Sequence, residues 1–118
     1  MKDKKTIPLK SCLHSTHEAS WILELKNIIK NEQRLWDVIE YSKIMSDMTR
    51  GSIIFLLYKK WGLCVCDLAS TLDMSSQAIS NQLIKLYDKR IITRQKKGLS
   101  VYYSLIDKNF ISFLSYIL

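Results

Sequence analysis

Long apolar runs are missing from this sequence. The longest, residues 53–58, has six residues, whereas a helix that crosses a membrane needs roughly 20. The chain starts with the charged stretch Met1-Lys-Asp-Lys-Lys, and no apolar segment of the kind found in a signal peptide follows it. These two absences predict a cytoplasmic protein that does not enter a membrane.

Cysteine is also scarce. The chain contains three, an odd number, and Cys64 and Cys66 stand one residue apart, too close to bridge each other comfortably. A disulfide framework is therefore not indicated. Reduced thiols in a cytosol fit better, and they raise the question of metal binding or redox chemistry.

Acidic residues are few at the C-terminal end. Residues 76–118 hold seven basic and two acidic side chains, whereas residues 12–75 hold seven basic and eight acidic ones. Residues 1–11 add four lysines and one aspartate, and the whole chain carries a net charge of +7. This asymmetry fits a polyanion partner, most simply nucleic acid, and it also fits a solvated basic face.

A chain of 118 residues forms one domain with a small core, and a domain of this size often gains stability by dimerising. We expect a mobile N-terminal arm over residues 1–14 and a folded domain over residues 15–118. Ser15 and Glu18 have capping-box spacing and predict the start of a first helix. Two further helices should follow, the second after Asn31 and the third from Asp47 or Thr49 to Gly62.

The next segments predict a helix-turn-helix. Asp67 or Cys66 should open a short helix, residues 73–75 form a tight turn, and Ser75 or Ser76 caps a longer helix. Residues 91–94 and 101–105 are rich in β-branched and aromatic residues, which predicts a β-hairpin with Lys96-Lys97-Gly98 at its tip. The fold class is therefore mainly α with a small β-hairpin, a winged helix-turn-helix.

The second helix of that unit has a polar exposed start. Short polar side chains there are suited to base edges in the major groove of double-stranded DNA, and nearby cations are suited to phosphates. The candidate DNA-binding residues are Ser76, Gln77, Ser80, Asn81, Lys85, Arg94, Lys96 and Lys97. Lys89 is a further phosphate candidate, and each residue taken singly fits a solvated surface position equally well.

The last helix, residues 108–118 with Asp107 as its cap, is apolar nearly all round. One small domain cannot bury every side of a terminal helix, so an interface with another chain is the simplest explanation. The alternative is a terminal helix that is docked only on its own core.

Cys64 and Cys66 fall at the start of the first helix of the helix-turn-helix. Thiolate is the form that binds metals, and a helix N-terminus favours an anion. Two sulfurs are too few for a complete site. Three thiolates suit a trigonal soft ion such as lead or arsenite, and two thiolates with two nitrogens suit zinc or cadmium.

Several ordered motifs between residues 42 and 107 resemble the ArsR/SmtB family of bacterial metal-sensing repressors. They are Ser46-Asp-Met-Thr-Arg50, Leu63-Cys-Val-Cys-Asp-Leu-Ala69, Ser76-Gln-Ala-Ile-Ser80, Leu83 to Leu86, Gly98, and Tyr102-Tyr-Ser-Leu105. Cys64-Val-Cys-Asp-Leu68 is most similar to the thiolate-sensing cadmium/lead (CadC) and arsenite (ArsR) branches. Met48 stands where the family usually has proline, and Gly51 where it has an apolar residue.

The resemblance implies a homodimer built on the first and last helices, operator DNA as partner, and release of that DNA when metal binds. The arsenite pattern has a third cysteine where this chain has Ala69. In the cadmium/lead pattern the arm supplies cysteines, which makes Cys12 the best third ligand and His14 a plausible fourth, with His17 weaker. A second family site on the last helix is not supported, since Asn109 stands where a histidine is expected. The effector is then cadmium, lead, zinc or arsenite.

Other readings of the same residues remain open. Cys64 and Cys66 also fit a redox or persulfide switch with Cys12 as the resolving thiol, or an idle site in a constitutive DNA-binding protein. They also fit two buried small hydrophobic residues with no ligand role. A thiol enzyme fits poorly, because the spacing is one residue short of Cys-x-x-Cys and no βαβ pattern is present. We therefore expect that the chain is not an enzyme.

Overall fold

The computed structural model describes residues 18–118. Its elements are α1 (Glu18–Lys30), α2 (Gln33–Met45), α3 (Met48–Lys59), β1 (Leu63–Cys64), α4 (Val65–Leu72), α5 (Ser76–Asp88), β2 (Ile92–Lys97), β3 (Ser100–Leu105) and α6 (Lys108–Ile117). The chain divides into two compact units, Met1–Trp36 and Asp37–Leu118. The predicted division into an arm over residues 1–14 and a domain over residues 15–118 stays a prediction.

The described part of the first unit consists of α1 and the first turn of α2. Large apolar side chains of α1 are exposed: Trp21 is 54%, Ile28 59% and Ile29 49% accessible. A free helix of 13 residues is marginal in water, so its stability depends on burying such a face. The predicted cap at Ser15 lies outside the described residues.

The second unit holds the core, to which every helix from α2 to α6 contributes. Its central side chains are fully or almost fully buried: Ile53, Ile54, Leu57, Leu68, Ile79, Leu83, Leu86, Leu105, Phe110 and Leu114. Phe110 of α6 packs against Tyr41 of α2, with ring centroids 5.0 Å apart. α6 is thus anchored on one side, while Tyr116, Ile117 and Leu118 at its end stay exposed.

Side-chain caps set several of the helix starts as expected. Asp47 accepts from the N–H of Arg50 at 2.9 Å, Ser75 from Ala78 at 3.1 Å, and Asp107 from Phe110 at 3.0 Å. Such caps satisfy N–H groups that have no partner within the helix. The turn between α4 and α5 uses Asp73 in the left-handed region (φ 54°), and Met74 N–H donates to Ala69 O at 3.0 Å. The helix-turn-helix prediction is confirmed.

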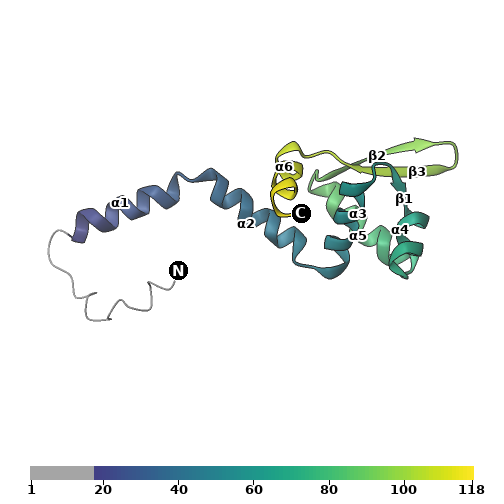
Figure 1. Cartoon of the computed structure of the whole chain (residues 1–118), viewed down its shortest axis with the longest axis horizontal. Coiled ribbons are helices and arrows are strands. Elements are labelled where there is room, and N and C mark those ends of the chain that lie inside the picture. The colour runs from purple at the N-terminus through teal and green to yellow at the C-terminus, as the bar shows by residue number, and fades with distance from the viewer. Residues whose placement is uncertain (1–17) are drawn as a thin grey trace. The chain divides into compact units, whose positions relative to one another are not determined.

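The sheet is antiparallel with strand order β1-β3-β2, and the hairpin of β2 and β3 extends beyond the helices (Figure 1). The sheet contains one strand that the sequence did not predict, and one prediction about the hairpin turn needs correction. β1, which pairs Leu63 with Tyr103 and Cys64 with Tyr102, was not expected, because a two-residue strand has no alternation to detect. Lys96 and Lys97 belong to β2 and pair with Val101 and Ser100, so the turn itself is Gly98-Leu99. Gly98 has φ +64°, a conformation that glycine adopts without strain.

We expect Phe110→Ala to lower the free energy of unfolding by about 3–5 kcal/mol, because it removes a fully buried ring and leaves a cavity beside Tyr41. Urea denaturation followed by circular dichroism measures this. Met48→Ala is the control: Met48 is 86% exposed, and its substitution should change the value by less than about 0.5 kcal/mol. Equal losses in the two variants would contradict the packing of α6.

Candidate nucleic-acid interface and metal site

Cys64 and Cys66 lie at the junction between the sheet and the helix-turn-helix. Cys64 is the last residue of β1 and the N-cap of α4, whereas Cys66 lies in the first turn of that helix. Both thiols are free, Cys64 half-buried and Cys66 exposed. The predicted start of α4 at Cys66 or Asp67 is therefore corrected to Val65. Both sulfur-bearing residues nevertheless belong to one helix start, as the sequence indicated.

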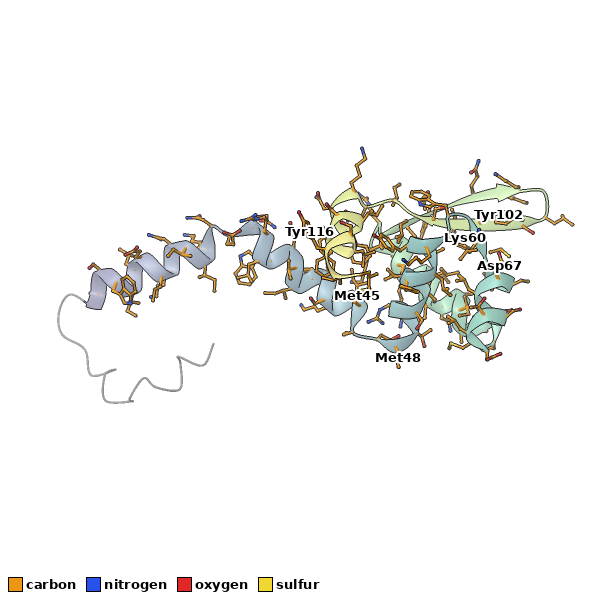
Figure 2. All side chains as sticks on the ribbon, in the orientation of Figure 1. Met45, Met48, Lys60, Asp67, Tyr102 and Tyr116 are labelled. Carbon is orange, nitrogen blue, oxygen red and sulfur yellow. The ribbon has the colours of Figure 1, made fainter. Side chains whose placement is uncertain are left out.

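Asp67 holds this helix start together, and Figure 2 shows it at the beginning of α4, next to the hairpin. Its Oδ2 atom accepts from the backbone N–H of Cys64 at 3.1 Å. That hydrogen bond first, and a second one with the Cys64 side chain, hold the pKa of Asp67 below its ordinary value. The carboxylate thus fixes the backbone of Cys64 relative to α4.

The two thiols do not form a complete metal site within the described part of the chain. Between residues 18 and 118, no group of three or more His, Cys, Asp or Glu side chains is arranged to hold a metal ion. Ala69, which occupies the place of a local third cysteine, packs against the core. The other predicted ligands, Cys12, His14 and the weaker His17, lie outside the described residues.

The polar stripe of α5 faces solvent. Ser76, Gln77 and Asn81 are exposed and Ser80 is half-buried, while Ile79, Leu83 and Leu86 occupy the opposite, buried side. Gln77 Nε2 donates to Asn81 Oδ1 at 2.9 Å. This bond leaves the Gln77 carbonyl oxygen as an acceptor and the Asn81 amide nitrogen as a donor. One acceptor and one donor complement the N6–H donor and the N7 acceptor that adenine presents in the major groove.

The side chains predicted to contact phosphates differ in whether another side chain of the protein orients them. Lys85, Lys96 and Lys97 are exposed, the last two close to the hairpin turn. The Arg94 guanidinium lies 4.2 Å from the ring centroid of Tyr87, a cation–π contact that orients it. The structure brings the α5 residues together on one helix and places the lysines of β2 on a separate element.

Two cations near α5 were missed from the sequence. Lys43 of α2 and Arg50 of α3 line a hollow of about 210 Å³ together with Lys85 and Lys89. Periodicity within one helix gives no information about which residues of other helices lie nearby, so only the general basic excess could have suggested them.

No helix in the described region, residues 18–118, has the length and apolar character needed to cross a membrane.

Residues 47–94 match the family described as bacterial regulatory protein, arsR family. The cadmium resistance transcriptional regulatory protein CadC homolog of Staphylococcus aureus is 37% identical over 78 residues, which cover 66% of this chain and 64% of that protein. The arsenical resistance operon repressor of Bacillus subtilis (strain 168) is 33% identical over 73 residues, covering 62% and 70%.

Solved structures give the same result. The AntR antimony-specific transcriptional repressor superposes with a TM-score of 0.63 and 31% identity, over 73% of this chain and 78% of that one. The chain spans between 52% and 64% of the length of three of the curated relatives it matches. Because the matched residues 47–94 contain the helix-turn-helix, and one relative that is 33% identical is covered over 70% of its length, the chain belongs to the arsR family of bacterial regulatory proteins.

Proposed function

We propose that this protein is a cytoplasmic transcriptional repressor. It binds double-stranded operator DNA as a homodimer, and it releases the DNA when a soft metal ion binds Cys64 and Cys66 together with Cys12. The observation that carries this proposal is the position of the two thiols, which start α4, the first helix of the helix-turn-helix. Anything that binds them acts directly on the unit that faces DNA.

The surface chemistry of α5 supports DNA reading. Gln77 and Asn81 offer a paired acceptor and donor, held in place by their mutual hydrogen bond of 2.9 Å. Lys85, Lys96 and Lys97 supply exposed charge for phosphates, which gives affinity and register with little sequence information. Reading and anchoring are thereby assigned to different side chains.

Exposed apolar side chains support a homodimer. α1 exposes Trp21 (54%), Leu23 (59%) and Ile28 (59%), and the end of α6 exposes Ile117 (53%) and Leu118 (52%). Faces of this kind in a small domain are typical of interfaces. A second copy also suits the reading of an operator with two-fold symmetry.

The donor set supports a soft metal as effector. Two thiols need further ligands, and Cys12 with His14 would supply a third sulfur and a nitrogen. Three thiolates favour lead or arsenite, and a mixed sulfur and nitrogen set favours zinc or cadmium. The relatives above are named for cadmium, arsenical and antimony responses, which agrees with this class of ion.

Release of DNA requires that metal bind the DNA-free conformation better than the DNA-bound one, since coupling is a difference of affinities. Joining the arm to the start of α4 would shift the two helix-turn-helix units of the dimer out of groove spacing. Cys64 suits this role because its backbone is tied both to β3 and to Asp67.

A redox or persulfide switch is the second candidate. Cys66 is an exposed free thiol, and exposure is one condition for reversible oxidation. Thiol titration before and after exposure to persulfide or peroxide distinguishes this switch from metal sensing.

We expect Gln77→Ala to reduce the discrimination between a selected duplex and a random one by about 1–3 kcal/mol, because one amide of the reading pair is lost. Lys97→Gln should weaken binding to both duplexes alike and lower the salt slope by about one. Fluorescence anisotropy over a series of salt concentrations measures both quantities. If Lys97→Gln alters discrimination and Gln77→Ala alters only the salt slope, the assignment is wrong.

Cys64→Ser should retain DNA binding and lose its response to metal, because one of the two fixed sulfurs is gone. Anisotropy with cadmium, lead, zinc, arsenite and mercury in turn tests this. Ultraviolet titration of the thiolate–metal band should show fewer sulfurs per ion in Cys12→Ser than in the wild type. Thr71→Ser, on the same helix and without a thiol, is the control. Release of DNA by metal from Cys64→Ser would refute the ligand assignment.

The homodimer should depend on the exposed face of α1. Trp21→Glu with Ile28→Glu should shift the protein towards monomer, because two charges would have to be buried in the interface. Light scattering after size exclusion measures the mass. Lys26→Gln with Lys30→Gln, on the same helix, changes the net charge by the same amount and is the control. A mass that is unchanged in the first variant would argue against α1 as part of the interface.

A further inference from the structure

A basic hollow lies where three helices of the second unit meet. It has a volume of about 210 Å³ and is lined by Glu40, Lys43 and Ile44 of α2, Arg50 of α3, Lys85 of α5 and Lys89 just after it. Four cations therefore surround it with a single carboxylate. We call these six residues the basic hollow.

The carboxylate does not cancel this charge. Glu40 Oε2 lies 3.2 Å from Lys43 Nζ, and the two side chains are 65% and 68% exposed. Water and salt screen such a pair strongly. Asp88, the other acid near the end of α5, lines a different hollow with Tyr87 and Arg90. Arg50, Lys85 and Lys89 thus remain without an acidic partner in the basic hollow.

Arg50 is fixed in place before any ligand arrives. Its Nε donates to Ile44 O at 3.2 Å and its Nη2 to Lys43 O at 3.3 Å. These bonds use two of the five N–H donors of a guanidinium. The remaining donors and the positive charge are held at the hollow without further loss of side-chain entropy.

The hollow continues the reading stripe of α5. Gln77, Asn81 and Lys85 follow one another along α5 at intervals of four residues, at steps of about 6 Å, and Lys89 follows as the C-cap. Each step turns the row by about 40°, so the row winds gradually around the helix from the amides to the lysines. The first two are amides and the last two are cations. A face that passes from base-reading amides to lysines matches DNA, in which the major groove is bordered by phosphates.

We propose that the basic hollow holds a phosphate of the operator backbone, so that α2 and α3 contact DNA as well as α5 and the hairpin. This inference rests on the proposed function and extends it, because it assigns Lys43, Arg50 and Lys89 to the DNA interface. It competes with a purely structural role in which these cations offset the carbonyl ends of α2 and α5.

The test is a double variant, Lys43→Gln with Lys89→Gln, which leaves the structural Arg50 in place. Binding to a fluorescent random-sequence duplex, and to a duplex selected with the wild-type protein, is measured by anisotropy over a series of salt concentrations. The slope of log affinity against log salt should fall by about two, one for each lysine. Discrimination between the two duplexes should stay unchanged.

The matched control is Lys60→Gln with Lys108→Gln, which removes the same charge elsewhere. Both lysines are exposed, and Lys60 follows the C-terminal end of α3, whereas Met48 begins that helix (Figure 2). The salt slope of this control variant should match that of the wild type. Glu40→Gln should instead tighten binding severalfold, because it removes the only carboxylate of the hollow.

The possible results distinguish a failure of the proposed function from a failure of the phosphate contact alone. If the wild type shows no salt-dependent binding to either duplex, the proposed function fails, and this inference fails with it. If the wild type binds but the Lys43/Lys89 variant has the slope of the control, the inference alone is overturned. In that case a lowered melting temperature of the variant assigns these lysines to the helix ends.

Discussion

The backbone of Cys64 is bound from two directions, and this constraint joins the two halves of the DNA-facing unit. On one side Cys64 pairs with Tyr102 in the sheet, and on the other its N–H donates to Asp67 within α4. The neighbouring Gly62 N–H also donates to Ser104 Oγ of β3 at 3.0 Å. The hairpin and the helix-turn-helix therefore share one short connection. A displacement of Cys64 must be accommodated by β3 or by α4, since its backbone is tied to both.

The same junction explains why thiols belong there. The first backbone N–H groups of α4 have no partner within the helix, so the N-cap and the first turn favour an anionic thiolate, whereas the N–H groups farther along α4 are used by the helix itself. Asp67 keeps this start formed while its negative charge lies close to both cysteines. A bound cation would be attracted by the thiolates and by Asp67 together, so a carboxylate that caps the helix also favours a positively charged effector.

Much of the fold could be predicted because the caps are local signals. Ser75 and Asp107 identify helix starts from single residues, and Ile79, Leu83 and Leu86 mark a buried side by spacing alone. Membership of a family of regulatory proteins confirms the prediction that the chain is not an enzyme. β1 was missed because two residues carry no period, and Lys96 and Lys97 were placed in the turn because a charged pair next to glycine resembles a loop. The basic hollow depends on which helices meet, and no local pattern contains that information.

Exposed apolar side chains lie on α1 and at the end of α6. Their position bears on how a second copy of the chain would affect the cysteines and the reading helices. In the second unit the side chains of α3, α4 and α5 that face inward are buried, yet Ile117 and Leu118 at the end of α6 are not, and α1 exposes apolar residues along its length. An unpaired face of this kind costs free energy in water, roughly 25 cal/mol for each Å² left uncovered. A second copy would cover such faces and would fix the distance between two reading helices. Cys64 and Cys66, two ligands short of a tetrahedral site, would then be completed by the arm of one protomer or the other, so that occupancy of the metal site and the spacing of the reading helices become one equilibrium.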